Sequence, residues 1–320
     1  MDTIDHDRLF KELLTNFFQE FMEAFFPEAG RMLDYSSLEF LTQEILTDIT
    51  AGEKKYIDIL VKTRLLGEEG FVLVHVEPQA RKEKNFARRM FRYYARLFLK
   101  YDMRILPVAV LSHKTKKEEP NSFNITFPFH NVLDFTFLQL HLKRLNWRDY
   151  LKKTNPAAAA LLACTDYREE EKEQLKLEFF KAILRLKLDP ARMQLIIGFF
   201  DSYVKLTSQE EERVQQKLAK ELPPGEVKEM TEILTSYHLR GMEKGIEKGM
   251  EKGMEKGNIT ALQRTLVKQI KKKLGHISRE TEKIITDTTD IARLEKALEF
   301  IFDLDSEETL LNLLKNNNEL

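Results

Sequence analysis

Two acidic residues and a glutamine occupy positions where metal-dependent chemistry could take place. Asp58 lies in one strand-like run, and Glu77 and Gln79 lie in the next. The segment between the runs has the composition of a turn, so we expect a β-hairpin. If its loop is centred between Gly67 and Glu68, the carboxylates of Asp58 and Glu77 lie directly opposite each other on one face.

The register of this hairpin decides what the face can do. Side chains alternate along a strand, so an even-length loop separates the aliphatic residues from the polar ones. The aliphatic set is Ile57, Ile59, Val61, Val72, Val74 and Val76. Like charges directly opposite destabilise a sheet, and a divalent cation between them removes that cost. Mg²⁺ is the usual ion held by one or two carboxylates, so we expect half of a magnesium site, with Mn²⁺ as the alternative ion. The competing interpretation is an ordinary hairpin with an acidic outer face.

The composition limits the classes of protein to consider. The chain has 320 residues, of which 32% are charged and 42% apolar, as expected of a soluble globular protein with more than one structural unit. The net charge of −1 means that nucleic acid must be bound by local patches. The single cysteine, Cys164, excludes an internal disulfide and a cysteine-based zinc site, and fits the cytoplasm. The N-terminus lacks signal-peptide features and no apolar stretch approaches 18 residues, so no membrane association is expected.

The elements around the hairpin predict an α/β sandwich. Apolar residues at helical spacing predict helices, and short apolar runs predict strands. In chain order they are a helix over residues 7–26, strands over 37–41 and 44–49, the hairpin, a helix over 84–100 and a strand over 104–111. The apolar face of the second helix is predicted to contain Ala87, Phe91, Tyr94 and Phe98.

The remainder of the chain is predicted to be mainly helical. After a polar loop at 114–121 and a strand at 123–129, helical patterns cover 138–151, 157–163, 169–188, 191–206 and 210–221. We therefore expect a core at 1–133, a helical extension at 134–240, a repeat at 241–257 and a C-terminal helical unit at 258–320.

The repeat at 241–257 consists of successive Met-Glu-Lys-Gly or Ile-Glu-Lys-Gly units. In a helix its glycines would form one stripe, and each costs about 1 kcal/mol relative to alanine. One interpretation is a solvated linker. The other is a glycine face that lets a second copy approach closely, which would make the protein a homo-oligomer.

Basic residues follow the hairpin directly. They are Arg81, Lys82, Lys84, Arg88, Arg89, Arg92, Arg96 and Lys100. Arg88, Arg92 and Arg96 recur every four residues, so they share one face of the predicted helix. We expect this face, with Arg89, to contact the DNA backbone, although a solvated basic face is the alternative.

The histidines give no comparable signal. The chain has seven: His6, His75, His113, His130, His141, His238 and His276. Their spacing matches no metal-ligand motif. His75 shares the Glu77 face, two residues away, so it could support that carboxylate, but we expect it to be an ordinary surface residue. No glycine-rich phosphate loop, nucleotide fingerprint or hydrolase elbow is present.

Several short motifs in the N-terminal part resemble the recombination-promoting nuclease (Rpn) or putative transposase family of the PD-(D/E)XK nuclease superfamily. They are His-Asp-Arg-Leu-Phe-Lys-Glu-Leu-Leu at 6–14, Tyr-Ile-Asp-Ile-Leu at 56–60, His-Val-Glu-Pro-Gln at 75–79 and Arg-Tyr-Tyr at 92–94. The charged glycine repeat before a small helical unit is also similar in layout. The resemblance implies a restriction-endonuclease-like α/β core, a mixed sheet flanked by helices, followed by a mainly α-helical C-terminal half.

The resemblance also implies roles for individual residues. Asp58 and Glu77 match the two metal-binding acids of a magnesium-dependent DNA endonuclease linked to recombination or transposition. Gln79 stands where the superfamily has lysine, and glutamine can only orient or hydrogen-bond. Arg88, Arg89 or Arg92 could supply the missing positive charge.

An acid from the first helix, Asp7 or Glu12, could add a metal ligand. Asp7 is equally a candidate for the cap of that helix, as is Asp5. Two other functions remain open. One is a degenerate nuclease fold that binds DNA or protein without cutting. The other is a self-assembly protein that acts through its helical half.

Overall fold

The protein is described from a computed structural model, which covers residues 5–41, 45–47, 54–56, 59–68, 71–115, 118–151 and 153–315. The chain divides into two compact units, residues 1–235 and 236–320. The predicted core, 1–133, falls within the first unit, whereas the predicted helical extension, 134–240, crosses the boundary between the units. The finer boundaries proposed from the sequence stay a prediction.

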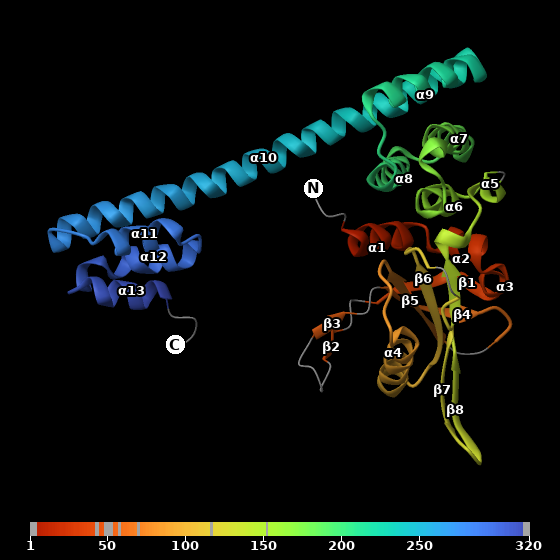
Figure 1. Ribbon diagram of the computed structural model, residues 1–320, viewed down its shortest axis with the longest axis horizontal. Helices are drawn as coiled ribbons and strands as arrows, with labels where there is room; N and C mark the ends of the chain where they lie inside the picture. Colours follow the sequence, from red (N-terminus) through yellow and green to blue (C-terminus); the bar gives the residue numbers. More distant parts are fainter. Residues whose placement is uncertain are drawn as a thin grey trace. The chain divides into compact units, whose positions relative to one another are not determined.

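A five-stranded mixed sheet forms the centre of the first unit (Figure 1). In spatial order its strands are β1 (Leu33–Phe40), β4 (Ile59–Leu65), β5 (Phe71–Gln79), β6 (Arg104–Leu111) and β9 (Leu138–His141). The pairs β1–β4 and β4–β5 are antiparallel, whereas β5–β6 and β6–β9 are parallel. This confirms the mixed sheet flanked by helices. The helix predicted over 138–151 is wrong at its start, because a short apolar run fits both periodicities and here forms β9.

Both faces of the sheet are covered, so β5 is buried continuously from Val72 to Pro78. Figure 1 shows α4 (Phe86–Tyr101) on one face and the N-terminal helices on the other. The row of α4 that is buried consists of Phe86, Met90, Tyr93 and Leu97. The predicted apolar face is therefore displaced, and Phe98 is 43% exposed.

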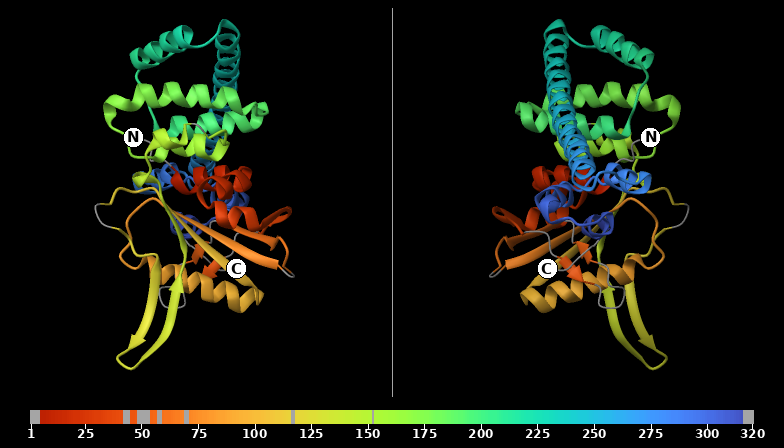
Figure 2. Two further views of the ribbon diagram at one scale, coloured as in Figure 1. Left: turned by 90° about the vertical axis from the view of Figure 1, so that its right-hand side faces the viewer. Right: turned by 90° about the vertical axis from the view of Figure 1, so that its left-hand side faces the viewer.

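The helix α4 has two adjacent apolar rows, which explains this error. The second row packs against the hairpin of β7 (Ser122–Phe127) and β8 (His130–Thr136), where Phe91 stacks on Phe123 with ring centroids 5.4 Å apart. Figure 2 shows this hairpin extending away from the sheet as an arm. Only its first strand was expected from the sequence.

The single helix predicted over 7–26 is divided into α1 (His6–Asn16) and α2 (Phe18–Phe25), followed by α3 (Pro27–Met32). The backbone leaves helical geometry at Phe17, whose φ and ψ are −132° and 37°. The side chain of Phe17 is fully buried. The apolar spacing continues across this break, so periodicity alone does not reveal it.

The strand-like run that contains Asp58, residues 55–61, contributes to two sheets. Its first part, β3 (Lys54–Tyr56), pairs with β2 (Ile45–Thr47) in a separate two-stranded sheet. Its second part is β4 of the main sheet.

A helical layer packs on α1 and α2. It contains α5 (Trp147–Tyr150), α6 (Pro156–Leu161), α7 (Lys172–Leu186), α8 (Pro190–Tyr203) and α9 (Ser208–Glu221), with short 3₁₀ turns at 142–144, 162–164 and 169–171. Aromatic contacts fix the layer: Phe10 of α1 meets Phe199 of α8 edge-on at 5.3 Å. Phe179 stacks on Phe200 at 3.8 Å. These contacts make the helical layer continuous with the core of the first unit.

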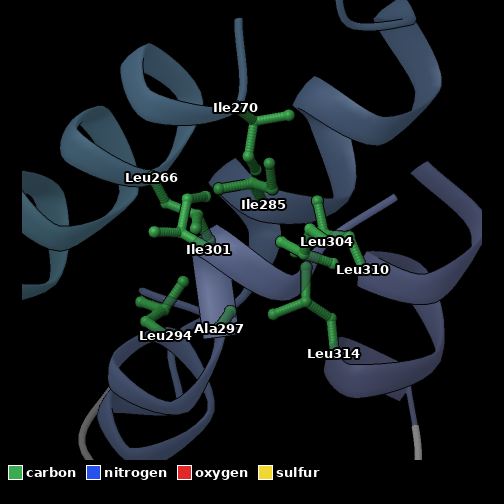
Figure 3. Packing of buried hydrophobic residues seen from close by; sticks show 9 residues of the cluster. All are labelled: Leu266, Ile270, Ile285, Leu294, Ala297, Ile301, Leu304, Leu310 and Leu314. Carbon is green, nitrogen blue, oxygen red and sulfur yellow. The ribbon is translucent and has the colours of Figure 1, made fainter. Parts of the chain in front are cut away.

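The second unit is a small helical bundle. It is built on the C-terminal part of α10 (Pro224–Leu274) with α11 (Arg279–Asp287), α12 (Ile291–Glu299), a 3₁₀ turn at 300–303 and α13 (Glu307–Lys315). Figure 3 shows its core, in which Leu266 and Ile270 of α10 meet Ile285, Leu294, Ile301 and Leu310. Within the described residues, no helix combines the length and apolar character that a membrane crossing requires.

Candidate functional site

The β4–β5 hairpin has the register that the predicted loop requires. Ile59 faces Val76, and Arg64 faces Phe71, so the loop is centred between Gly67 and Glu68. Asp58 and Ile57 lie outside the described residues. The opposition of Asp58 and Glu77 therefore stays a prediction.

Glu77 lies on the face of β5 that α4 covers, and only 5% of the residue is exposed. Its Oε1 accepts a hydrogen bond from Arg89 Nη2 at 3.1 Å, and His75 Nε2 lies 3.4 Å from its Oε2. A buried carboxylate is costly unless it is paired. The guanidinium of Arg89 provides that pairing, because α4 runs directly over the end of β5.

Arg89 connects the polar residues of the site. Besides Glu77, its Nη2 donates to Gln79 Oε1 at 2.5 Å, and its Nη1 forms an ion pair with Glu83. Gln79 Nε2 in turn donates to the carbonyl of Arg81 at 2.5 Å. Of the three arginines considered as the replacement for a lysine, the structure therefore brings Arg89 to Glu77 and Gln79.

The predicted basic stripe lies beside this group. Arg88 and Arg92 are exposed and Arg96 is half-buried. A pocket of about 170 Å³ on this side of α4 is lined by Glu83, Asn85, Arg88, Arg89, Arg92, Tyr93 and Arg96. Four guanidinium groups against one carboxylate make the pocket suitable for an anion. Because Arg89 both lines it and holds Glu77, an anion bound there lies close to the carboxylate.

In the described part of the chain, the first helix, α1, brings neither of its two candidate metal ligands, Asp7 and Glu12, into polar contact with Glu77 or Gln79. Its N-cap is Asp5, whose side chain accepts from the backbone N–H of Arg8 at 3.2 Å, so Asp7 is not the cap. Asp7 is exposed, and the exposed Glu12 lies 3.5 Å from Arg8. Within the described ranges, neither acid forms a hydrogen bond or ion pair with Glu77 or Gln79.

Comparison with known proteins finds a match for the segment that contains Glu77, Gln79 and Arg89. Residues 4–111 match the model of a family described as "Putative transposase, YhgA-like". This N-terminal segment, about a third of the chain, is similar to that family. The match runs from α1 to the last residue of β6, and so includes Glu77, Gln79 and Arg89. No curated protein and no solved structure matches the chain.

In the YhgA-like segment, His75 lies beside Glu77, which was the less expected of its two predicted positions. The residue was predicted to lie on the surface, but it is fully buried. Its ring meets Tyr93 of α4 edge-on, with centroids 5.7 Å apart. The prediction was wrong because the hairpin was expected to expose one face, whereas α4 covers it. His75 therefore positions Glu77 from within the core.

The described residues near Glu77 provide part of the ligand set that a hard cation such as Mg²⁺ requires. Mg²⁺ prefers oxygen ligands and usually takes one or two carboxylates. Among the residues that the structure describes, Glu77 Oε2 contacts only His75, at the long distance of 3.4 Å, whereas Oε1 is held by Arg89. Oε2 is therefore the oxygen available to an ion. The described residues thus offer one carboxylate for the metal, and the second, Asp58, is the predicted one.

A second polar cluster, just beyond the YhgA-like segment, was not predicted from the sequence. His113, Glu119 and His141 place their ligand atoms within 4.8 Å of one another. Their separation along the chain conceals this arrangement. A usable signal is that each histidine stands at the end of a strand, since the carboxyl ends of neighbouring parallel strands meet at one edge of a sheet.

Proposed function

We propose that the protein is a Mg²⁺-dependent endonuclease that cuts DNA in transposition or recombination. Asp58 and Glu77 are the proposed metal ligands, and Mn²⁺ is an alternative ion. The observation that most supports the proposal is the environment of Glu77. A buried carboxylate at a strand end contacts Arg89, which also lines an arginine-rich pocket. The match to a transposase family supports the link to transposition.

Each residue of the site has a distinct part in this proposal. When bound, Mg²⁺ would polarise the scissile phosphate and lower the pKa of a water molecule. Gln79 cannot carry a positive charge, so it orients neighbouring groups by hydrogen bonds. Arg89 provides the fixed positive charge beside the two carboxylates. Arg88, Arg92 and Arg96 hold the phosphates of the strand, because guanidinium groups match phosphate oxygens in geometry.

A second function has a specific observation in its favour. The guanidinium of Arg89 lies against Glu77 Oε1, where it competes with a metal ion for the carboxylate. A site neutralised in this way favours a degenerate nuclease fold that binds DNA without cutting it. The two candidates differ in one property, which is the dependence of DNA cleavage on a divalent cation.

Plasmid cleavage separates the two functions. We expect the wild-type protein to cut DNA with Mg²⁺ and to be inactive with EDTA, and Glu77→Gln to be inactive with Mg²⁺. The matched control is Glu68→Gln in the turn of the same hairpin, where Glu68 pairs with Arg104 at 2.6 Å, and this variant should cut normally. DNA binding without cleavage under every condition would support the binding protein and contradict the nuclease.

A further inference from the structure

Two histidines and a glutamate meet at the edge of the sheet, apart from Glu77. His141 is the last residue of β9, and it pairs in register with Leu111, the last residue of β6. His113 follows β6 by two residues, so the parallel pairing brings the two rings together, with centroids 5.7 Å apart. Glu119 comes from the loop that leads to β7, and only 8% of it is exposed. Strand register thus assembles residues that are distant in the chain.

The contacts of His113 match those of a metal ligand. Its Nδ1 lies 3.3 Å from the carbonyl oxygen of Gln79, and its Nε2 lies 2.6 Å from Glu119 Oε1. Metal-binding histidines usually donate one ring N–H to a backbone carbonyl, which directs the other nitrogen at the ion. If the proton of His113 is on Nδ1, the lone pair of Nε2 points at the carboxylate of Glu119. Two hydrogen-bond acceptors then face each other. A cation between them removes this conflict.

His141 provides the second, independent observation. Both of its ring nitrogens are shielded from solvent, and neither has a hydrogen-bond partner among the residues that the structure describes. Buried polar atoms are hydrogen-bonded as a rule, so an unpartnered one calls for an explanation. The ring lies beside His113, and one nitrogen belongs to the cluster of ligand atoms. A metal bound to this nitrogen would satisfy it.

We propose that His113, Glu119 and His141 bind a zinc ion. Two imidazoles and one carboxylate form a set that suits Zn²⁺, whereas Mg²⁺ prefers oxygen ligands alone. Ligands of one tetrahedral zinc are about 3.3 Å apart, so a small rotation of Glu119 away from His113 opens the space. Three protein ligands leave a fourth position for water. The ion ties the ends of β6 and β9 to the loop before β7 and, through His113, to the backbone of Gln79.

Zinc binding by the full-length protein tests the proposal directly. After dialysis against a chelator, calorimetric titration with Zn²⁺ alone should show one ion bound per chain. His113→Ala and His141→Ala should each weaken binding by more than about 100-fold, because the loss of an outer-shell partner alone costs about 10–100-fold. The control His130→Ala replaces an exposed histidine of β8 and should bind as the wild type does.

Two further measurements keep the outcomes distinct. Co²⁺ in place of Zn²⁺ should give the visible absorption bands of a low-symmetry nitrogen and oxygen site in the wild type, a readout that does not depend on any variant folding. Glu77→Gln should keep full zinc affinity, so loss of cleavage and loss of zinc binding are separable. The proposal is overturned if the wild type binds no stoichiometric Zn²⁺, which leaves a plain His113–Glu119 ion pair. Wild-type affinity in both folded histidine variants would overturn it equally.

Discussion

At the scale of residues, Arg89 is the side chain on which the Glu77 site depends. It contacts Glu77, Gln79 and Glu83 at once, and its own side chain is 17% exposed. Its guanidinium carbon Cζ also lies over the ring of Phe86, 5.1 Å from the ring centroid. Removal of one partner from a buried ion pair is more damaging than replacement of both, because the other charge stays buried without compensation.

Arg89→Ala should therefore lower the free energy of unfolding by about 3 kcal/mol, since Glu77 is left unpaired in the core. Chemical denaturation measures this change. The double variant Arg89→Ala/Glu77→Gln should recover part of the loss, because the uncompensated charge is gone. Equal stability of the single and double variants would contradict this explanation, because it would mean that the unpaired carboxylate of Glu77 costs nothing.

Cys164 offers a second prediction at this scale. The residue is buried at 2% exposure, and this burial raises the pKa of its thiol to about 12. A raised pKa keeps the group protonated at neutral pH, and the thiolate is the reactive form. A thiol reagent at pH 8 should therefore leave Cys164 unmodified in the folded protein and modify it fully in denaturant. Rapid modification of the native protein would contradict this description.

At the scale of elements, the helix α10 carries the repeat at 241–257. The repeat is helical, and its apolar residues remain exposed, from 56% at Ile246 to 74% at Met254. A Cβ added to Gly249 or Gly253 would meet nothing within 4 Å. Within one chain, therefore, no packing contact requires a glycine at either position. The two interpretations, a solvated helix and a seam between copies, predict different effects when these glycines are replaced by alanine.

Gly249→Ala/Gly253→Ala should raise the helix content of the repeat, because each exposed glycine costs about 1 kcal/mol relative to alanine. If the repeat is a solvated linker, circular dichroism should show this gain and the mass in solution should not change. If it is a seam between copies, the added methyl groups should weaken self-association. Sedimentation at several protein concentrations distinguishes the two.

Some helices and strands could be predicted from the sequence and others could not. The strand at 104–111 and the hairpin register follow from the sequence, because continuous aliphatic runs bounded by turns leave few alternatives. The strand β9 and the buried row of α4 could not be predicted, since each depends on tertiary packing that overrides an ambiguous local pattern. Glu77 could be identified from its position in the hairpin. Its partner Arg89 could not be chosen over Arg88 or Arg92, because that choice also depends on how α4 packs on β5. The cluster of His113, Glu119 and His141 depends on strand order, which no local motif encodes.

At the scale of the whole molecule, the charge is almost balanced, with a net value of −1. In the proposed function, affinity for DNA would then come from the local basic face of α4, because a nearly neutral chain exerts no general attraction. Each phosphate contact releases counterions, so the number of contacts can be read from the dependence of binding on salt.

Arg88→Ala/Arg92→Ala should reduce the slope of log K against log salt by about 2, because each lost phosphate contact lowers it by roughly 0.9. Fluorescence anisotropy with labelled DNA at several salt concentrations measures the slope. The matched control is Lys205→Ala/Lys220→Ala, which removes two exposed charges near α8 and α9. An equal reduction in both double variants would exclude a specific basic face.

In the proposed function, Asp58 and Glu77 together hold the metal of a DNA endonuclease. The most direct test is the rate of plasmid cleavage by Asp58→Ala in Mg²⁺, beside the wild type and Glu68→Gln. We predict that Asp58→Ala loses more than about 100-fold in rate, as expected of a metal ligand, while Glu68→Gln keeps the wild-type rate. Cleavage by Asp58→Ala at the wild-type rate would contradict the claim.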